Sequence, residues 1–304
     1  MKILIIRFSA IGDIVLTTPV MRALKQWNPD VEIHYITKKQ NIGLLESHPS
    51  VDHLHAWDDG VPAALQHQTF DLILDLHNNW RSWRIRWAVK GPVKTFYKAN
   101  WERFLWVHLG IKKRFPTAVN RYLKTIRHLG IEGSFPLFFP NTLEPQKLHE
   151  PTEWQGTYQV MVLGAAHATK RIPEDKMLLW MNPHDRWIFV GGPDEQEQGE
   201  RLAAKNPTTW VNAAGLCSFR ESAWILEHAS HIIAGDTGMM HLACAFPVPL
   251  TVVWGSTSGD LGMPALSQAA VTNKIVTNLD CWPCTKRGKD RCPKGHFRCM
   301  TEQV

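Results

Sequence analysis

Short apolar runs rich in β-branched residues alternate along this chain with stretches of helical periodicity. Examples of such runs are "KILII" at residues 2–6 and "LTVVW" at residues 250–254. The runs are almost continuously apolar rather than alternating in polarity, as expected for strands that helices cover on both faces. The pattern therefore predicts βαβ units and parallel sheets.

Nine strands are expected from these runs, four in the first half of the chain and five in the second. They are residues 2–6, 32–37, 71–76, 93–97, 159–163, 187–190, 209–212, 231–234 and 250–254. Residues 140–156, "PNTLEPQKLHEPTEWQG", are rich in proline and polar side chains and predict a linker. A chain of 304 residues is long for a single core. We therefore expect an α/β fold of two doubly wound, Rossmann-like domains, residues 1–150 and 151–304, facing one another across a cleft.

Composition indicates a cytoplasmic protein. The apolar fraction is 44%, and no apolar run approaches the ~20 residues of a membrane-spanning helix. Arg7 and Asp13 interrupt the first apolar stretch too early for a secretion signal. Six cysteines in a reducing compartment are expected as thiols or metal ligands rather than as disulfides.

Basic charge is concentrated between Asn78 and His128. Against the single acid Glu102, this segment carries thirteen basic residues: Arg81, Arg84, Arg86, Lys90, Lys94, Lys98, Arg103, Lys112, Lys113, Arg114, Arg121, Lys124 and Arg127. Trp80, Trp83, Trp87, Trp101 and Trp106 lie among them. The charge indicates an anionic partner. Aromatic and basic residues together suit nucleic acids, sugars and membrane interfaces alike.

The segment "RFSAIGDIVLTTPV", residues 7–20, follows the first predicted strand. In parallel sheets, ligands bind outside the carboxyl ends of the strands. Gly12 is expected to allow the turn there and Asp13 to begin the next helix at that edge; alternatively, Asp13 is only a helix cap, worth about 1 kcal/mol. Pro19 either bends that helix or occupies its first position after a Thr18 cap.

A second candidate site follows a strand of the other half, in "GDTGMMHLA" at residues 235–243. Asp236, Thr237 and Gly238 predict a tight turn that opens a helix carrying His241. Free N–H groups at such a helix start can bind an anion. The alternatives are a capped turn without a ligand and a histidine buried in the core.

Two further segments reach the same edge of that predicted sheet. "LGAAHATKRIP" at residues 163–173 brings Thr169 and Lys170 there, and a lysine can hold a diphosphate without a metal. In "GGPDEQE" at residues 191–197, Glu195 either contacts a ribose hydroxyl or is an exposed acid at a helix start. Neither half carries G-x-G-x-x-G after its first strand, and no P-loop motif is present. This weighs against a dinucleotide oxidoreductase and a P-loop NTPase.

The last residues of the sequence are rich in cysteine. Cys281, Cys284, Cys292 and Cys299 begin with a C-x-x-C pair, which predicts a closed structural zinc site. Packed free thiols and disulfides are the alternatives. Cys217 and Cys244 are each expected to pack as small apolar residues.

Four segments together resemble the lipopolysaccharide heptosyltransferases of glycosyltransferase family 9. They are "RFSAIGDIVLTTPV", "AHATKRIP", "GDTGMMHLACAFPVPLTVVWGST" and "CWPCTKRGKDRCPKGHFRCM". The resemblance implies a GT-B fold, with an acceptor domain in residues 1–150 and a nucleotide-sugar domain in residues 151–304 that ends in a Cys-rich tail, 277–304. It also implies inverting transfer of heptose from ADP-heptose to the inner core of lipopolysaccharide, with no cofactor or metal for catalysis.

The resemblance also assigns roles by position. It implies that Asp13 is the general base and that Lys170 binds the diphosphate and assists its departure. The donor residues it implies are Thr169, Lys170, Glu195, Asp236, Thr237, Gly238 and His241. "DLHNNWRS" at residues 75–82 resembles the acceptor-side segment, so Gly12, Asn79, Arg81, Ser82 and Arg84 are expected to bind the acceptor.

The expected partners are ADP-heptose and an anionic lipopolysaccharide-core acceptor at the inner membrane surface, without nucleic acid. We expect a monomer, cytoplasmic and peripheral to the inner membrane. Two rival functions remain open. A non-catalytic nucleotide- or polyanion-binding protein would bind without turnover, and another two-domain sugar enzyme, such as a nucleotide-sugar epimerase, would turn over the donor without an acceptor.

Overall fold

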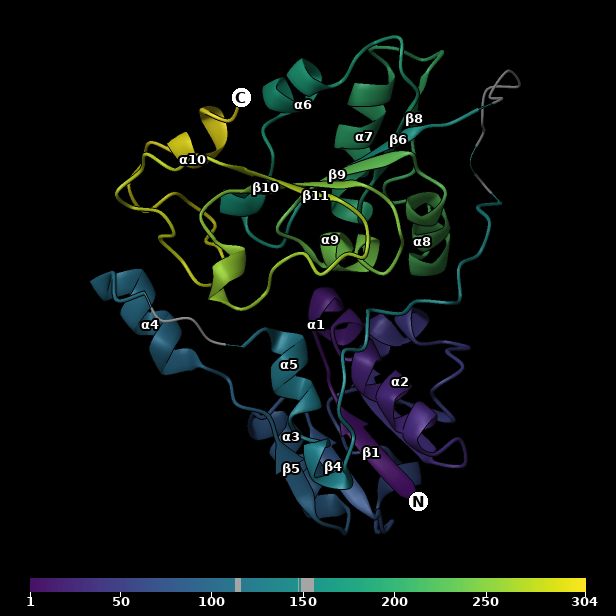
Figure 1. Ribbon diagram of the computed structural model, residues 1–304. Coiled ribbons are helices and arrows are strands. Elements are labelled where there is room, and N and C mark those ends of the chain that lie inside the picture. The colour runs from purple at the N-terminus through teal and green to yellow at the C-terminus, as the bar shows by residue number, and fades with distance from the viewer. Residues whose placement is uncertain (113–115, 147, 149–155) are drawn as a thin grey trace. The chain divides into compact units, whose positions relative to one another are not determined.

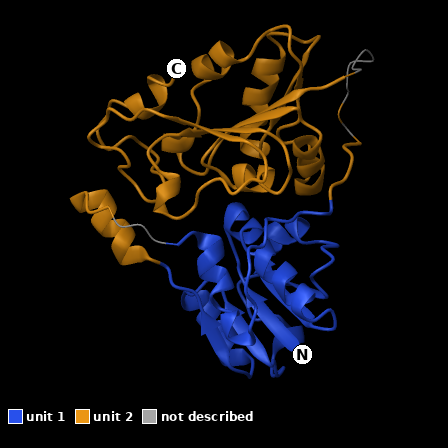
Figure 2. Ribbon diagram, viewed as in Figure 1, with its two compact units in different colours: residues 1–98, 116–141 blue, residues 99–115, 142–304 orange. Residues whose placement is uncertain are grey.

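The chain forms two compact units, which Figure 2 colours separately. The computed structural model describes residues 1–112, 116–146, 148 and 156–304. Unit 1 comprises residues 1–98 and 116–141, and unit 2 comprises residues 99–115 and 142–304. The predicted domain boundary between residues 150 and 151 lies outside the described residues, as do Lys113, Arg114 and part of the predicted linker.

Unit 1 contains a five-stranded sheet in the order β3-β2-β1-β4-β5, in which every pair is parallel (Figure 1). The central strand β1 is buried because it pairs on both sides: Ile3 lies opposite Ile33 of β2 and Leu72 of β4. The strands are β1 Lys2–Ile6, β2 Glu32–Lys38, β3 His53–Trp57, β4 Leu72–Asp75 and β5 Val93–Thr95.

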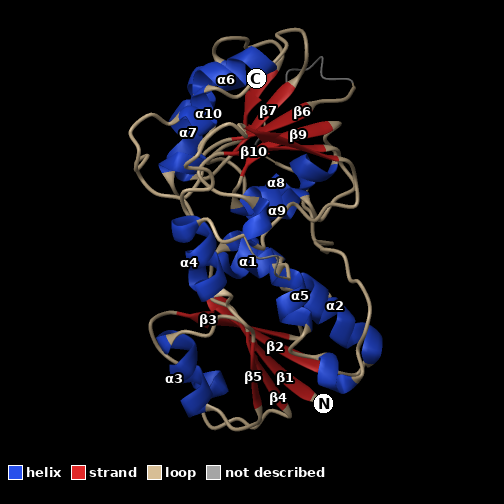
Figure 3. Cartoon of the chain, turned by 60° about the vertical axis from the view of Figure 1, so that its left-hand side comes forward, coloured by secondary structure: helices blue, strands red, loops and turns tan. Residues whose placement is uncertain are grey.

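Helices cover both faces of this sheet. Figure 3 shows α3 on one side of the strands and α2 with α5 on the other. Leu4 and Ile6 of β1 share a buried cluster with Ile85 of α3. The helices are α1 Ile11–Val15, α2 Thr18–Trp27, α3 Trp80–Ala88 and α5 Ala118–Leu123, with 3-10 turns at Lys39–Leu44, Ala63–Leu65 and Arg127–Leu129.

Unit 2 contains a six-stranded sheet in the order β11-β10-β9-β6-β7-β8, and its pairs are also parallel. The strands are β6 Gln159–Val162, β7 Trp187–Val190, β8 Trp210–Asn212, β9 His231–Gly235, β10 Leu250–Trp254 and β11 Val271–Ile275. Figure 1 shows α6 and α7 on one side of this sheet and α8 and α9 on the other. The helices are α4 Asn100–Leu109, α6 Glu174–Trp180, α7 Gln196–Ala203, α8 Phe219–Glu227, α9 Gly238–Ala243 and α10 Arg298–Thr301, with 3-10 turns at Ala168–Lys170, Pro193–Glu195 and Gly259–Leu261.

These two parallel sheets confirm the predicted α/β class. Strands at residues 2–6, 187–190 and 250–254 are confirmed to the residue, and the other six predicted strands differ from the structure by one or two residues at an end. The prediction missed β3 and β11, each of which is one of the two outer strands of its sheet. Both carry exposed or half-exposed side chains along most of their length, so neither reads as a continuous apolar run.

Pro19 lies at the start of a second helix rather than at a bend within one helix. The chain makes a short helix, α1, and then starts α2 at Thr18, with Pro19 inside the first turn, where its missing N–H costs nothing. The residue at the cap position is Thr17 rather than Thr18. In the part of the chain that the structure describes, no helix combines the length and the apolar character needed to cross a bilayer.

Unit 1 should lose stability in mild acid because of three poorly solvated histidines. Burial lowers the pKa of His48 and of His55 to about 4 and of His77 to about 3, whereas unfolded histidine titrates near 6.5. Between about pH 6.5 and 4 the unfolded chain therefore binds up to three more protons at these histidines than the folded chain, so the free energy of unfolding falls as pH falls. Urea titrations at several pH values measure this slope.

Single substitutions test which histidines cause the pH dependence of the free energy of unfolding. His48→Gln should reduce the difference in bound protons by about one, because that ring no longer titrates in the unfolded chain. His128→Gln, at an exposed position of the same unit, should leave the slope unchanged. Equal slopes in all three proteins would contradict the assignment.

Candidate active site

Asp13 lies just beyond the carboxyl end of β1 and is held by two side chains. Its Oδ2 is 2.6 Å from Nη2 of Arg7, and the hydroxyl of Tyr122 donates to its Oδ1 at 3.2 Å. Arg7 is buried, and its Nη1 also donates to the carbonyl oxygen of Leu76 and to the Tyr122 hydroxyl. About a quarter of the Asp13 side chain stays open, at 23% exposure. The carboxylate is thus oriented without being enclosed.

The charges around Asp13 keep this arrangement ionised. Burial alone would lower the pKa of Arg7, but the negative charge of Asp13 and the neighbouring tyrosines raise it overall. Burial also raises the pKa of Tyr122, so this hydroxyl stays neutral and donates. The guanidinium in turn favours the charged form of the Asp13 carboxylate. Gly12 lies inside α1 rather than in a turn before it, which corrects its predicted role.

Asn79 and Ser82, two of the predicted acceptor residues, are occupied at the start of α3. Asn79 Oδ1 accepts from the backbone N–H groups of Arg81 and Ser82, both at 3.0 Å. The Ser82 hydroxyl donates at 2.8 Å to Oδ2 of Asp75, whose Oδ1 accepts from the N–H groups of His77 and Asn78. These contacts fix the segment that follows β4, and acceptor binding by Asn79 and Ser82 stays a prediction.

The arginines of α3 differ in their surroundings. The guanidinium carbon of Arg81 lies 5.3 Å from the Trp80 ring, and Arg84 lies 5.4 Å from the Trp57 ring. Arg86 instead lies 3.6 Å from the buried carboxylate of Asp75. Three exposed indoles accompany them, at Trp80, Trp83 and Trp87. Arg81 and Arg84 are therefore the arginines of this helix without a carboxylate partner among the described ion pairs.

In unit 2, Lys170 meets the residue that follows β9. Lys170 Nζ is 2.9 Å from Oδ2 of Asp236, and the Thr257 hydroxyl donates to the same oxygen at 2.6 Å. Asp236 is buried, at 9% exposure. An ammonium group carries three donors, so this ion pair orients Lys170 and leaves donors for another ligand.

Two glycines allow the Lys170 loop to pack this closely. A Cβ added to Gly235 would lie 2.6 Å from the carbonyl oxygen of Lys170. A Cβ added to Gly255 would lie 2.4 Å from the carbonyl oxygen of Thr169. Real Cβ atoms do not approach oxygen that closely, so the ends of β9 and β10 require glycine where they touch the loop.

Thr169, beside Lys170, is a buried anchor for the loop. Its hydroxyl oxygen accepts from the backbone N–H of Lys289 and from the Ser256 hydroxyl, both at 2.8 Å. Its own N–H donates to the carbonyl oxygen of Lys289. Thr169 thus places Lys170 but has its polar groups satisfied by the protein.

The predicted turn at residues 236–238 is a capped helix start. The Thr237 hydroxyl accepts from the N–H of Met240 at 3.2 Å, and Gly238 is the first residue of α9. His241 is buried within that helix. Both the capped turn and the buried histidine weighed in the sequence analysis are therefore present, beside the Lys170–Asp236 pair.

Glu195 is not an exposed acid at a helix start. Its Oε2 accepts from the N–H of Gly192 at 2.9 Å, and its side chain is only 13% exposed. A Cβ added to Gly164 would lie 2.1 Å from Glu195 Oε1, and Gly164 has a left-handed backbone, at φ +66°. The carboxylate therefore lies against the segments that follow β6 and β7, on the same edge of the sheet as Lys170.

Comparison with known proteins places this arrangement in a family. The family model described as glycosyltransferase family 9 (heptosyltransferase) matches residues 61–294. The chain belongs to this family. It is 24% identical over 323 residues to lipopolysaccharide heptosyltransferase 1 of Pseudomonas aeruginosa, covering 94% of this chain and 87% of that protein. It is 22% identical over 315 residues to lipopolysaccharide heptosyltransferase 2 of Escherichia coli, covering 91% and 89%.

A solved structure supports the fold of this family 9 glycosyltransferase. The E. coli heptosyltransferase WaaC with ADP superposes with a TM-score of 0.69 at 20% identity, covering 93% of this chain and 97% of that one. The expected GT-B fold is therefore confirmed, and the chain is a glycosyltransferase.

The sequence did not predict several residues that build the two candidate sites. Tyr122 and Arg7 are 115 positions apart, and no local pattern links them. Asp75 begins "DLHNNWRS" and is the last residue of β4, and an acid at the carboxyl end of a buried strand is a signal related to the one at Asp13. Thr257 carries no signal beyond its position after β10.

Proposed function

We propose that this family 9 enzyme transfers heptose from ADP-heptose to the inner core of lipopolysaccharide with inversion at the anomeric carbon. The main structural support for ADP-heptose as the donor is the Lys170–Asp236 ion pair. The loop that contains Lys170 packs against Gly235 and Gly255. The match to lipopolysaccharide heptosyltransferases over most of the chain supports the acceptor half.

Asp13 is the general base in this proposal. An acceptor hydroxyl has a pKa far above 7, so a carboxylate within hydrogen-bond reach must take its proton as the new glycosidic bond forms. Asp13 combines a charged carboxylate with an open side. Arg7 and Tyr122 act as positioning residues, since they hold the carboxylate rather than meet the acceptor.

Lys170 binds the diphosphate and stabilises the negative charge that grows on the leaving ADP. One positioned donor of this kind contributes on the order of 3 kcal/mol to the transition state. Asp236 orients the ammonium group, and Thr257 holds Asp236. Glu195 lies on the same sheet edge, where its carboxylate can accept from a ribose hydroxyl. No step requires a metal to carry charge, because Lys170 already supplies a cation.

A transfer assay tests this function. The protein is incubated with ADP-heptose and a panel of truncated lipopolysaccharide cores, and the released ADP and the extended core are both measured. Inverting transfer predicts one ADP for each heptose added, with the anomeric configuration reversed. ADP-heptose bound without turnover would favour the binding-protein alternative, and altered donor without any acceptor would favour an epimerase-like enzyme.

The acceptor surface includes α3 in this proposal. Arg81 and Arg84 offer cations to an anionic core, and the exposed indoles of Trp80, Trp83 and Trp87 suit a membrane interface. Anionic membrane surfaces attract each nearby basic residue by about 1 kcal/mol. We therefore place the enzyme in the cytoplasm, at the inner membrane surface.

Acceptor affinity should fall as salt rises, because screening weakens charge attraction at an exposed surface. Arg81→Gln/Arg84→Gln should flatten this salt dependence, as measured by the apparent KM for the acceptor at several ionic strengths. Arg86 is left intact, since its loss would remove the partner of buried Asp75.

The control for this test is Lys124→Gln/Arg127→Gln, which removes the same charge at exposed positions away from α3. It should keep the wild-type slope. Equal flattening by both double variants would show a general charge effect rather than an acceptor surface on α3.

The proposal also includes a structural zinc ion in the Cys-rich tail. Burial, together with the charges of the other three tail thiols, raises the pKa of Cys299 to about 12. Cys281 Sγ is 3.6 Å from Nε2 of His296. Buried thiols of high pKa are neutral without a metal, whereas zinc takes them as thiolates and draws them together.

Protein purified without chelator should contain about one equivalent of zinc by elemental analysis. Cys284→Ser should lose the metal and lower the melting temperature, whereas Cys217→Ser, outside the tail, should keep it. Metal-free protein whose four tail thiols titrate freely, with an ordered tail, would rule the zinc out without affecting the transferase assignment.

A further inference from the structure

A second group of polar side chains lies on unit 1, at the end of the sheet opposite to Asp13. Glu32 begins β2, and His34 follows two residues later, so both point to the same face. His53 begins β3 and is the register partner of His34, and His55 follows it by two residues. These four residues therefore line one face at the amino ends of β2 and β3. Asp13 follows the carboxyl end of β1.

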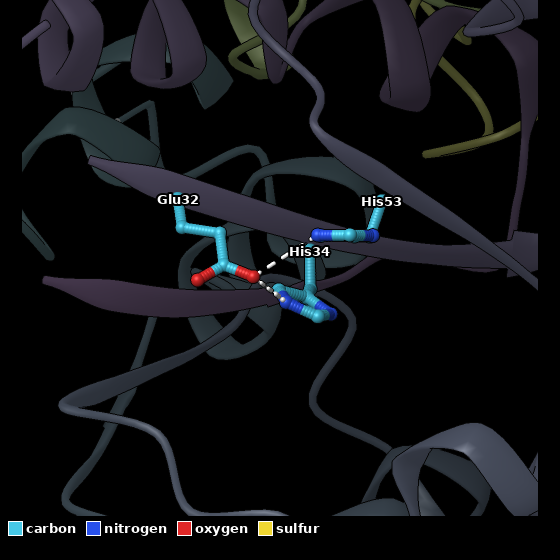
Figure 4. Close-up of side chains that lie close together, drawn as sticks. All are labelled: Glu32, His34 and His53. Atoms are coloured by element: carbon cyan, nitrogen blue, oxygen red, sulfur yellow. Dashed lines mark hydrogen bonds and ion pairs between the residues drawn. The ribbon is translucent and has the colours of Figure 1, made fainter. Parts of the chain in front are cut away.

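Three of these side chains converge on one point. Glu32 Oε1 is 2.9 Å from Nε2 of His34 and 3.0 Å from Nε2 of His53 (Figure 4). The three ligand atoms lie within 4.8 Å of one another. Across the described ranges of the chain, no other group of three or more histidine, cysteine or acidic side chains meets that distance. Convergence on a shared point is what a metal ion requires of its ligands.

The Nδ1 atom of His34, which points away from Glu32, has a hydrogen-bond partner in His55. His34 is buried, and its Nδ1 is 2.9 Å from Nε2 of His55. A histidine that binds a metal usually donates its second ring N–H to a fixed acceptor, which sets the tautomer and the ring orientation. His34 can donate Nδ1–H to His55, which leaves the Nε2 lone pair free to face a metal.

The chemistry of the group also suits ligation, because two imidazoles and one carboxylate can each offer a lone pair to the shared point. Lys2 has a partner of its own: its ammonium group donates to Gln68 at 2.7 Å and lies 5.3 Å from the centre of the Phe70 ring.

We infer that Glu32, His34 and His53 form a binding site for a divalent transition-metal ion, with zinc as the ion that the ligand set fits. Two imidazoles and a carboxylate bind zinc with a fourth position left for water. Tetrahedral ligands at 2.0–2.1 Å stand roughly 3.3–3.4 Å apart. The present separations of 2.9 and 3.0 Å need only a small opening. Glu32 and His53 are about half exposed and free to make it.

Such an ion would join the outer strand β3 to β2. Metal-free full-length protein is titrated with Zn²⁺ by calorimetry and with Co²⁺ by absorption, because a nitrogen and oxygen site gives visible bands without thiolate charge transfer. This separates the site from the cysteines of the tail. His53→Ala should weaken the nitrogen and oxygen site by at least ~100-fold, and His55→Ala, which removes only the hydrogen-bond partner of His34, by about 10–100-fold.

The control is His128→Ala, an exposed histidine of the same unit, which should bind like wild type. Zn²⁺ should also raise the wild-type melting temperature more than that of His53→Ala, while the two melt alike without metal because His53 is exposed. A Co²⁺ spectrum showing only thiolate ligation, or an unchanged affinity in His53→Ala, would overturn the proposal. Neither readout depends on heptosyl transfer.

Discussion

Replacing Asp13 with asparagine should slow heptosyl transfer by at least ~10²-fold while ADP affinity stays within about twofold. The amide keeps the shape of the side chain and can still accept from Tyr122, but it cannot take a proton from the acceptor. In the proposed function ADP binds to unit 2, where Lys170 and Asp236 lie. Steady-state transfer rates and calorimetry with ADP measure the two quantities.

Asp13 is also the partner of buried Arg7, so the variant needs a stability control. Losing the carboxylate charge beside a buried guanidinium costs about 1–3 kcal/mol of stability, and rates must be measured well below the melting temperature. Tyr122→Phe removes the hydrogen bonds of the hydroxyl to Asp13 and Arg7 but keeps the carboxylate, so it should slow transfer by less than ~10-fold. Asp30→Asn, an exposed acid of unit 1, should behave like wild type. Near-normal transfer by Asp13→Asn would reduce Asp13 to a structural partner of Arg7.

Lys170→Ala should weaken ADP and ADP-heptose by roughly 10–100-fold, as expected when a hydrogen bond to a charged group worth about 1.5–3 kcal/mol is lost. Adenosine, which lacks the diphosphate, should bind almost as before. Calorimetry with the three ligands gives the comparison. Lys205→Ala, at an exposed position of the same unit, provides the matched control.

The ion pair with Asp236 complicates this variant in a way that can be measured. Without Lys170, the Asp236 carboxylate keeps the Thr257 hydroxyl as its described partner but loses its cation. Lys170→Ala/Asp236→Asn removes that unpaired charge. If ADP still binds weakly to the double variant, the loss belongs to the lysine; equal losses for adenosine would indicate damage to the fold instead.

The sequence predicted every inner strand of the two sheets but only two of the four outer strands, β5 and β8. A strand covered on both faces must be apolar throughout, and "KILII" and "LTVVW" show this directly. β3, "HLHAW", pairs on one side only and carries histidines at its exposed end, so its sequence resembles a loop. His53 of the candidate metal site lies on this strand, and the site was missed together with the strand.

The residues of the candidate active site also differ in how well the sequence predicts them. Asp13 and Lys170 stand next to strands that the sequence identifies, so their position could be predicted. Their partners could not: Tyr122 reaches Asp13 from 109 positions away, and Lys289 reaches Thr169 from 120 positions away. Such pairs are set by topology rather than by local pattern. Ser82 shows a further role that the sequence did not predict, since its hydroxyl supports the start of α3.

The hydrogen bonds that Ser256 and Lys289 make to Thr169 have a consequence for synthesis of the protein on the ribosome. The loop that carries Lys170 emerges early in unit 2, but Ser256 and Lys289, which hold Thr169, are translated 87 and 120 residues later. A nascent chain can therefore form β6 and β7 long before this loop has its final support. If Lys170 binds the nucleotide as proposed, we expect unit 2 to bind it only after the tail has left the exit tunnel, and a chain that ends before Lys289 to lack this support of the loop.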